Sequence, residues 1–103
     1  MAAAPFALIA EPNRRRILDA LLAGERPVGD LVASLALSQP AVSKHLRVLR
    51  EGGLVNVRTD AQRRLYSLSP GPLHEVDDWL APYRERWPSR LDALEQHLNA
   101  MAD

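Results

Sequence analysis

Apolar residues recur at helical spacing through the middle of the chain. Two stripes can be traced: Val28, Leu31, Val32 and Leu35, followed by Val42, Leu46 and Leu49. This spacing predicts two helices that each turn one face toward a core. Only Ala36 and Leu37 separate the first stripe from Ser38, so the two helices have to cross steeply. A steep crossing after a short turn is the geometry of a helix-turn-helix, which is expected over residues 28–53.

The second helix has sequence signals at both of its ends. Ser38 is a favourable N-cap, and Pro40 is tolerated in the first turn, where its missing N–H would have had no partner anyway. Gly52 and Gly53 follow the last periodic leucine and supply the left-handed residue that commonly ends a helix. The helix is therefore expected to begin at residues 38–40 and to end near Gly52.

The exposed face of this second helix carries small hydrogen-bonding groups at its start and cations farther along. Its residues are Gln39, Pro40, Ser43, Lys44, Arg47 and Arg50, with no acid before Glu51. A basic helix face of this size fits double-stranded DNA, whose major groove accepts a helix. An ordinary helical hairpin with a solvated basic face is the alternative.

Alternating apolar and polar residues after the second helix predict a β-hairpin over residues 54–69. Strand-forming residues lie on both sides of residues 59–62, which have the composition of a turn. The turn lacks the Asn-Gly or Asp-Gly of a two-residue type I′ loop, so a four-residue loop is expected. A hairpin in this place is a wing. Arg58, Arg63 and Arg64 are expected to cluster at its tip, where they can reach phosphates or a minor groove.

Both ends of the chain carry more apolar surface than a small core can bury. A short helix is expected before Pro12, and a C-terminal helix is expected over residues 72–101, with interruptions that Pro82 and Pro88 cause near residues 81 and 87. The surplus apolar residues are Phe6, Ile9, Trp79, Tyr83, Trp87, Leu91, Leu94 and Leu98. They predict a homodimer joined through the terminal helices. The alternative is a monomer that folds its tail over its own domain.

The composition fits a single small domain. A chain of 103 residues can bury a core without help from a disulfide or a metal. It contains no Cys, which excludes thiol redox chemistry and thiolate metal ligands and fits a reducing cytoplasm. No segment has the length of a membrane span, and the N-terminus lacks the basic start of a signal peptide. We therefore expect a cytoplasmic protein that does not contact a membrane.

Charge is divided unevenly along the chain, although the formal net charge is zero. Residues 37–70 hold six cations and two acids, whereas residues 71–103 hold three cations and seven acids. The basic part is the one that contains the predicted second helix and wing, as an electrostatic footprint for DNA requires. The acidic part is expected to face away from the duplex.

Three stretches of the sequence resemble the ArsR/SmtB-type winged helix-turn-helix repressors. They are FALIAEPNRRRIL at 6–18, LSQPAVSKHLRVLREGGLV at 37–55 and RRLYSL at 63–68. The resemblance covers nearly the whole chain in the same order of elements. It implies a mostly α fold with a small β-hairpin, a homodimer built from the first and last helices, and a repressor that blocks a promoter until a signal releases it.

The resemblance implies no cofactor and favours the branch of the family without a metal site. Members that sense metals carry a Cys motif on the helix matching residues 29–35, or a His and acid set on the last helix. His74, Asp77 and Asp78 share one helix face here, but the next histidine, His97, comes 23 residues later. A weak metal site shared between two copies stays an alternative, and the sequence leaves the inducing signal open.

The candidate DNA-binding residues divide by their chemistry. The full set is Ser38, Gln39, Pro40, Ser43, Lys44, Arg47, Arg50, Arg58, Arg63 and Arg64. Gln39 and Arg47 are expected to read bases, because glutamine pairs with adenine and arginine with guanine. Ser38, Ser43 and the wing arginines are expected to contact the DNA backbone.

Other polar residues are assigned more modest roles. His45 borders the apolar stripe, so a packing or hydrogen-bonding role is favoured over base contact. The basic run at residues 14–16 is expected to be solvated, with one phosphate contact as the alternative. An enzyme is not expected, because the histidines are dispersed and no serine lies in a nucleophile-elbow or Gly-rich phosphate-loop context. A winged-helix module that binds an acidic protein is the remaining functional alternative.

Overall fold

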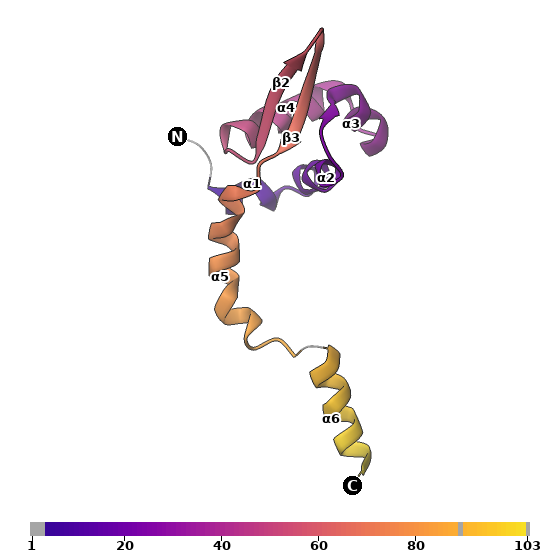
Figure 1. The fold of residues 1–103 in the computed structure, drawn as a ribbon, viewed down its shortest axis with the longest axis vertical. Helices are drawn as coiled ribbons and strands as arrows, with labels where there is room; N and C mark the ends of the chain where they lie inside the picture. The colour runs from indigo at the N-terminus through magenta and orange to yellow at the C-terminus, as the bar shows by residue number, and fades with distance from the viewer. Residues whose placement is uncertain (1–3, 89, 103) are drawn as a thin grey trace.

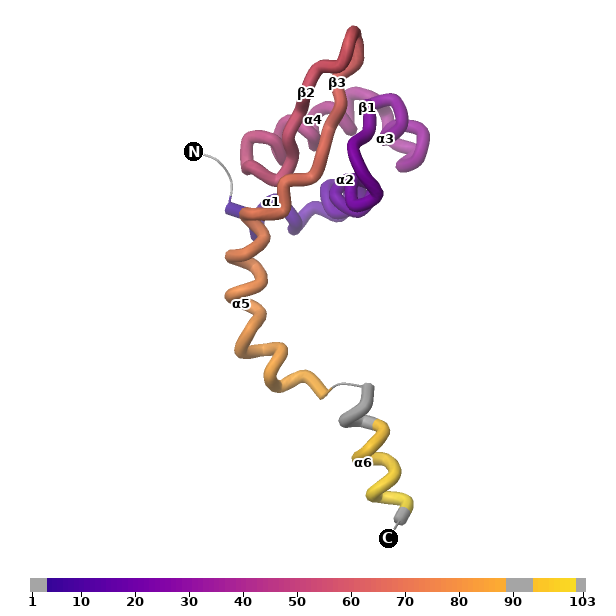
Figure 2. Tube along the Cα trace, in the orientation of Figure 1, coloured from indigo at the N-terminus to yellow at the C-terminus, as the bar shows by residue number. Residues whose placement is uncertain are grey.

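The computed structural model describes residues 4–88 and 90–102, with the side chains of 90–93 and 102 outside that description. The elements in chain order are α1 (Pro5–Ala10), α2 (Pro12–Leu21), β1 (Arg26–Pro27), α3 (Val28–Leu35), α4 (Gln39–Glu51), β2 (Val55–Asp60), β3 (Arg63–Leu68), the 3₁₀ turn η1 (Gly71–Leu73), α5 (His74–Arg84) and α6 (Arg90–Ala102). Figure 1 labels the helices and the wing strands, and Figure 2 also labels β1. The predicted fold class, mostly α with a small β-hairpin, is confirmed. The helix-turn-helix is formed by α3 and α4, and the wing is formed by β2 and β3.

Both ends of α4 are fixed by the signals seen in the sequence. The hydroxyl of Ser38 accepts a hydrogen bond from the backbone N–H of Ala41 at 3.2 Å, so the predicted N-cap is confirmed. At the other end Gly53 has a φ of +81°. The N–H of Leu54 donates to the carbonyl of Leu49 at 3.0 Å, which satisfies one of the last carbonyls of the helix.

The two predicted stripes meet in one core. Leu31, Val42 and Leu49 have no exposed surface, and Leu35 and Leu46 are nearly as deeply buried. The other residues of this core come from α1, α2 and the start of the wing: Leu8, Ile17, Leu18, Leu21, Leu54 and Val55. Because α4 buries one face so completely, its opposite face is held in a fixed orientation toward solvent.

The C-terminal end of α4 packs closely against α1. A Cβ atom built on Gly52 would lie 2.2 Å from Cδ1 of Leu8, a separation that no pair of side chains tolerates. Leu8 is itself completely buried. Glycine at position 52 therefore allows a leucine of α1 to close the core beneath the last turn of α4.

The sheet has three antiparallel strands in the order β1-β3-β2. Asp60 pairs with Arg63, so only Ala61 and Gln62 form the loop, and the four-residue loop expected from the sequence is wrong. The shorter loop is possible because Ala61 adopts a left-handed backbone with a φ of +56°, without the usual glycine or asparagine. The two-residue strand β1 was not predicted.

The C-terminal region consists of α5 and α6, and the interruption expected near residue 81 does not occur. Pro82 lies inside α5, where the freed backbone carbonyl one turn earlier is on an exposed helix and can bond water. The interruption expected near residue 87 is confirmed, because α5 ends at Arg84 and Pro88 disfavours helical backbone at the preceding residue.

The helices α5 and α6 project away from the rest of the molecule (Figures 1 and 2). We call these two helices the stalk. The radius of gyration is 18.8 Å and the longest extent is 68 Å, whereas a compact chain of this length has a radius of gyration of about 13 Å. The stalk therefore finds little of its own domain to pack against. Among the described helices, none combines the length and apolar character needed to cross a bilayer.

Candidate nucleic-acid interface

The predicted DNA-binding side chains of α4 all lie on its solvent-facing side. Gln39, Pro40, Ser43, Lys44, Arg47 and Arg50 are all exposed, as is the N-cap Ser38. This orientation follows from the burial of Val42, Leu46 and Leu49 on the other side of the same helix. The structure thus presents small polar groups on the first turn and cations on the later turns.

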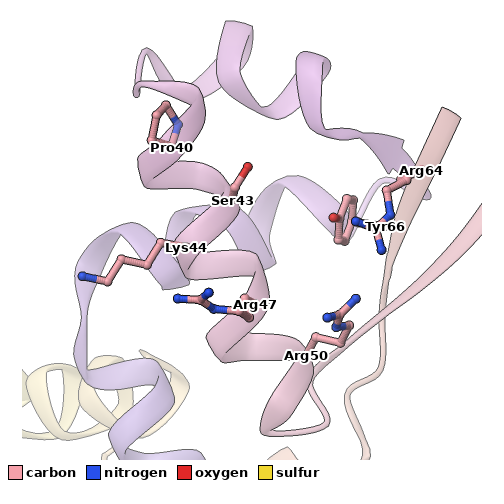
Figure 3. Close-up of a pocket in the computed structure, with 7 residues that line it drawn as sticks. All are labelled: Pro40, Ser43, Lys44, Arg47, Arg50, Arg64 and Tyr66. Atoms are coloured by element: carbon pink, nitrogen blue, oxygen red, sulfur yellow. The ribbon is translucent and has the colours of Figure 1, made fainter.

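A hollow separates α4 from the wing, and we call its lining the α4–wing face. Figure 3 shows the lining residues, which are Pro40, Ser43, Lys44, Arg47, Arg50, Arg64 and Tyr66. A second hollow continues the same surface toward the wing tip, and its lining includes Gln39, Gln62 and Arg63. We count these three residues as part of the α4–wing face. No acid lines either hollow. A surface with many donors and no carboxylate is suited to an anionic partner.

The cations of the α4–wing face have no acidic partner in the described part of the chain. Ion pairs there join His45 to Glu11, Arg58 to Glu25 and Arg84 to Asp77. None involves the five cations of this face, which are Lys44, Arg47, Arg50, Arg63 and Arg64. Their positive charge is therefore fully available to a ligand.

Arg15 and Arg16 of the basic run at residues 14–16 are exposed, as expected for a solvated run, but all three arginines also form hydrogen bonds within the protein that the sequence did not indicate. Arg14 donates through Nε to the carbonyl of Leu8 at 2.7 Å, and Arg16 donates to the carbonyl of Leu35 at 2.8 Å. Arg15 donates to the carbonyl of Ile9. These carbonyls lie at the ends of α1 and α3, where the helix leaves them without a partner. The run therefore fastens helix ends together.

Arg58 does not join the cluster expected at the wing tip. Its guanidinium donates two hydrogen bonds to Glu25, at 2.8 Å and 2.7 Å. The hydrogen bond from Arg58 lowers the pKa of Glu25, and the same contact raises the pKa of Arg58. Arg58 pairs with Leu65 in the ladder, so this ion pair reaches across β3 on the face of the sheet that Leu65 occupies. Arg58 thus braces the wing against the segment that precedes β1.

His45 has the packing environment expected for it. Its side chain is 18% exposed, and Nε2 lies 3.7 Å from Oε2 of Glu11. Burial tends to raise the pKa of Glu11, but hydrogen bonds from the backbone N–H groups of Arg14 and Asn13 and the nearby His45 outweigh burial, and the net pKa is lowered. Glu11 is also the N-cap of α2. His45 therefore connects α4 to the junction of α1 and α2.

The three residues considered for a metal lie together on the surface of α5. Ligand atoms of His74, Asp77 and Asp78 are within 4.8 Å of one another, and all three side chains are exposed. Asp77 also forms an ion pair with Arg84. His97 lies on α6 and is not part of this group. The donors that would complete a site are thus not brought together within the described chain.

The residues predicted for a dimer interface expose an aromatic row along α1 and α5. The ring centroids of Phe6 and Trp79 are 5.7 Å apart with the rings nearly perpendicular, and those of Trp79 and Tyr83 are 4.9 Å apart. Trp79, Tyr83, Trp87, Leu94 and Leu98 are each about half exposed. Ile9 differs, because it packs partly against the core of its own chain. The side chain of Leu91 lies outside the described residues.

Tyr66 is the residue of the α4–wing face that the sequence interpretation missed. It lies two positions after Arg64 in β3, so both side chains project from the same face of the strand. The strand alternation that predicted the wing was sufficient to place Tyr66 beside Arg64. Glu25 was also missed, since nothing local marks it as the partner of an arginine 33 residues away.

Comparisons with known proteins agree with this geometry. The family described as bacterial regulatory protein, arsR family, matches residues 11–57. The chain is 44% identical over 95 residues to HTH-type transcriptional regulator Rv2034 of Mycobacterium tuberculosis, covering 92% of this chain and 86% of the relative. It is 32% identical over 75 residues to the transcriptional repressor SdpR of Bacillus subtilis, covering 73% of this chain and 83% of the relative.

A solved structure described as a possible transcriptional regulator for arsenical resistance is also similar. Its TM-score is 0.69 at 38% sequence identity, over 92% of this chain and 96% of that chain. The chain belongs to the arsR family of bacterial regulatory proteins, and it is a DNA-binding winged-helix transcriptional regulator, not an enzyme.

Proposed function

We propose that this protein is a homodimeric repressor that binds a pseudo-palindromic operator and occludes the promoter within it. The observation that carries the proposal is the convergence of five unpartnered cations from α4 and the wing on one exposed face. Phosphate contacts supply most of the affinity of such proteins for DNA, and a helix in the major groove supplies the sequence discrimination. Similarity to a relative named a transcriptional repressor supports repression as the outcome.

Within this proposal the residues of α4 have different tasks. Gln39 is exposed at the first position of the helix and Arg47 lies two turns later, so both can reach base edges when α4 enters the major groove. The N-cap Ser38, together with Ser43, contacts the DNA backbone. Lys44 and Arg50 flank the base readers and neutralise phosphates. Arg63 and Arg64 do the same from the wing.

The stalk supports the homodimer. The aromatic rings on α1 and α5 are only about half covered by the described chain, and Leu94 and Leu98 of α6 are exposed to the same degree. Burial of large aromatic side chains is a strong driving force for association. A second copy related by a two-fold axis would bury the row on both chains and would present two α4 helices to successive half-sites.

The charge distribution supports this arrangement. The described acids after residue 70 lie on α5, on α6 or between them, whereas the cations without an acidic partner among the described residues lie on the α4–wing face. A dimer joined through the stalks therefore keeps its negative charge away from the duplex. Since it acts on the chromosome, the protein works in the cytoplasm.

The test is a binding measurement with purified protein and labelled duplex DNA. Size-exclusion chromatography at low salt should show retention of random duplex by the dimer, and genome-wide footprinting should return imperfect palindromes. A reporter under the recovered promoter should be less active when the protein is present. A protein that does not retain duplex DNA at low salt, or that sediments as a monomer at micromolar concentration, contradicts the proposal.

A further inference from the structure

Tyr66 occupies a fixed position in the α4–wing face. It lies in β3, the central strand, and pairs with Arg26 of β1 on one side and with Val57 of β2 on the other. Its ring is half-buried and packs against the core. The hydroxyl oxygen is therefore held at a defined height above the sheet, in contrast to the long and flexible cations around it.

The polar side chains that line the hollow together with Tyr66 are one serine and four cations. Arg64 projects from the same face of β3, and Arg50 faces both residues from the last turn of α4 (Figure 3). The hydroxyl forms no hydrogen bond with any described residue, and no carboxylate lines the hollow. A phenolic O–H that lines a hollow with several cations is well suited to donate to an anionic oxygen that those cations attract.

We propose that Tyr66 is a DNA-backbone ligand whose hydroxyl donates a hydrogen bond to a phosphodiester oxygen that Arg64 neutralises. This inference rests on the proposed function, because the phosphate is that of the strand lying between α4 and the wing when α4 is in the major groove. In this arrangement Arg64 provides the positive charge that attracts the phosphate, and Tyr66 fixes the place of the phosphate relative to the sheet. The depth at which α4 enters the groove is set by a side chain anchored in the core.

The substitution Tyr66→Phe tests the hydroxyl alone, because it keeps the ring that packs against the core. We expect it to weaken binding by the dimer about 10- to 100-fold, the effect of one hydrogen bond of about 3- to 10-fold in each protomer. The loss should be the same for the operator and for random duplex, since phosphates carry no sequence information. The salt dependence should be unchanged for Tyr66→Phe, which removes no charge, and shallower for Arg64→Ala.

Ser67→Ala is the matched control. It removes a hydroxyl from the next residue of β3, which projects from the opposite face of the strand, and it should bind DNA like the wild type. The thermal midpoints of all three proteins should agree, because the Tyr66 hydroxyl has no partner in the described chain to lose. A Tyr66→Phe variant that binds like the wild type overturns the inference, as does one that loses only operator binding.

Neutral methylphosphonates placed one at a time in the operator strand identify the phosphate. At one position in each half-site the neutral group should cost Tyr66→Phe less affinity than it costs wild type, because only the contact of Arg64 remains to be lost, so the two changes are less than additive. Additive losses at every position contradict the inference even if Tyr66→Phe binds weakly. Wild-type protein that retains no duplex refutes the proposed function itself, which separates that failure from a failure confined to Tyr66.

Discussion

The salt dependence of operator binding should separate the cations that face DNA from the arginine that braces the wing. Five cations of the α4–wing face have no acidic partner in the described chain, and one of them, Arg47, is assigned to a base. Under the proposed function the other four would make about eight phosphate contacts in a dimer. At about −0.9 per phosphate, log K should fall with log salt with a slope of about −7. A fourfold rise in salt, from about 50 to 200 mM, should then weaken binding on the order of 10⁴-fold.

Two single substitutions make this prediction specific. Arg64→Ala removes one phosphate contact per protomer, so the slope should become shallower by about 2 units in the dimer. Arg58→Ala removes a charge of the same sign from the same hairpin, but Arg58 is held by two hydrogen bonds to Glu25. Its loss should leave the slope unchanged. Fluorescence anisotropy titrations of labelled operator at several salt concentrations measure both slopes.

The comparison of the two variants can refute this reasoning. If Arg58→Ala flattens the slope as much as Arg64→Ala, then Arg58 leaves Glu25 to contact DNA and the division between bracing and binding arginines is wrong. If the wild-type slope is near −2, most of the exposed cations do not lie on phosphates. Sedimentation of each variant at the working concentration ensures that only dimers are compared.

Four further outcomes are expected. Arg47→Ala should reduce discrimination between operator and random duplex by about 1–3 kcal/mol, and an unchanged affinity ratio would mean that another residue reads the base. Trp79→Ala should shift sedimentation toward monomer while the far-ultraviolet circular dichroism stays the same; an unchanged dimer contradicts the interface. Ala36→Gly should raise the free energy of unfolding by up to about 1 kcal/mol in urea titrations, because position 36 has a φ of +55°; a loss of stability contradicts this relief of strain. Arg58 lowers the pKa of Glu25, so the stability that this pair contributes is present above the ordinary value of 4.5 and is lost as the pH falls through the folded pKa. The difference in unfolding midpoint between wild type and Glu25→Gln should therefore shrink from pH 6 to pH 3. A difference that stays constant over this range contradicts the prediction.

Local signals in the sequence predicted the elements that carry the site. The stripe of Val42, Leu46 and Leu49 was enough to orient α4, because burying that side leaves only one direction for Lys44 and Arg47. Ser38 and the glycines after Glu51 marked its ends for the same reason: capping depends on neighbours within a few residues.

Contacts between distant residues were beyond the reach of these patterns. Arg58 was placed at the wing tip because nothing near it in sequence competes for its charge, whereas the fold brings Glu25 to it. The run at 14–16 looked like a solvated patch because the carbonyls it binds belong to helix ends whose positions are set by packing. The two-residue wing loop depends on Ala61 accepting a left-handed backbone, which alanine seldom does.

In the proposed dimer, the close approach of Leu8 to Gly52 would link association to DNA reading. Leu8 points inward from α1 and meets the last turn of α4, while Phe6 points outward from the same short helix to the aromatic row. A partner chain that packs against Phe6 would therefore fix the position of α1, whose opposite side contacts the end of α4 and so affects the tilt of α4. The position of α1 would then affect the distance between the two α4 helices of the proposed dimer. A bulkier residue at position 52 should therefore change the half-site spacing that the protein prefers.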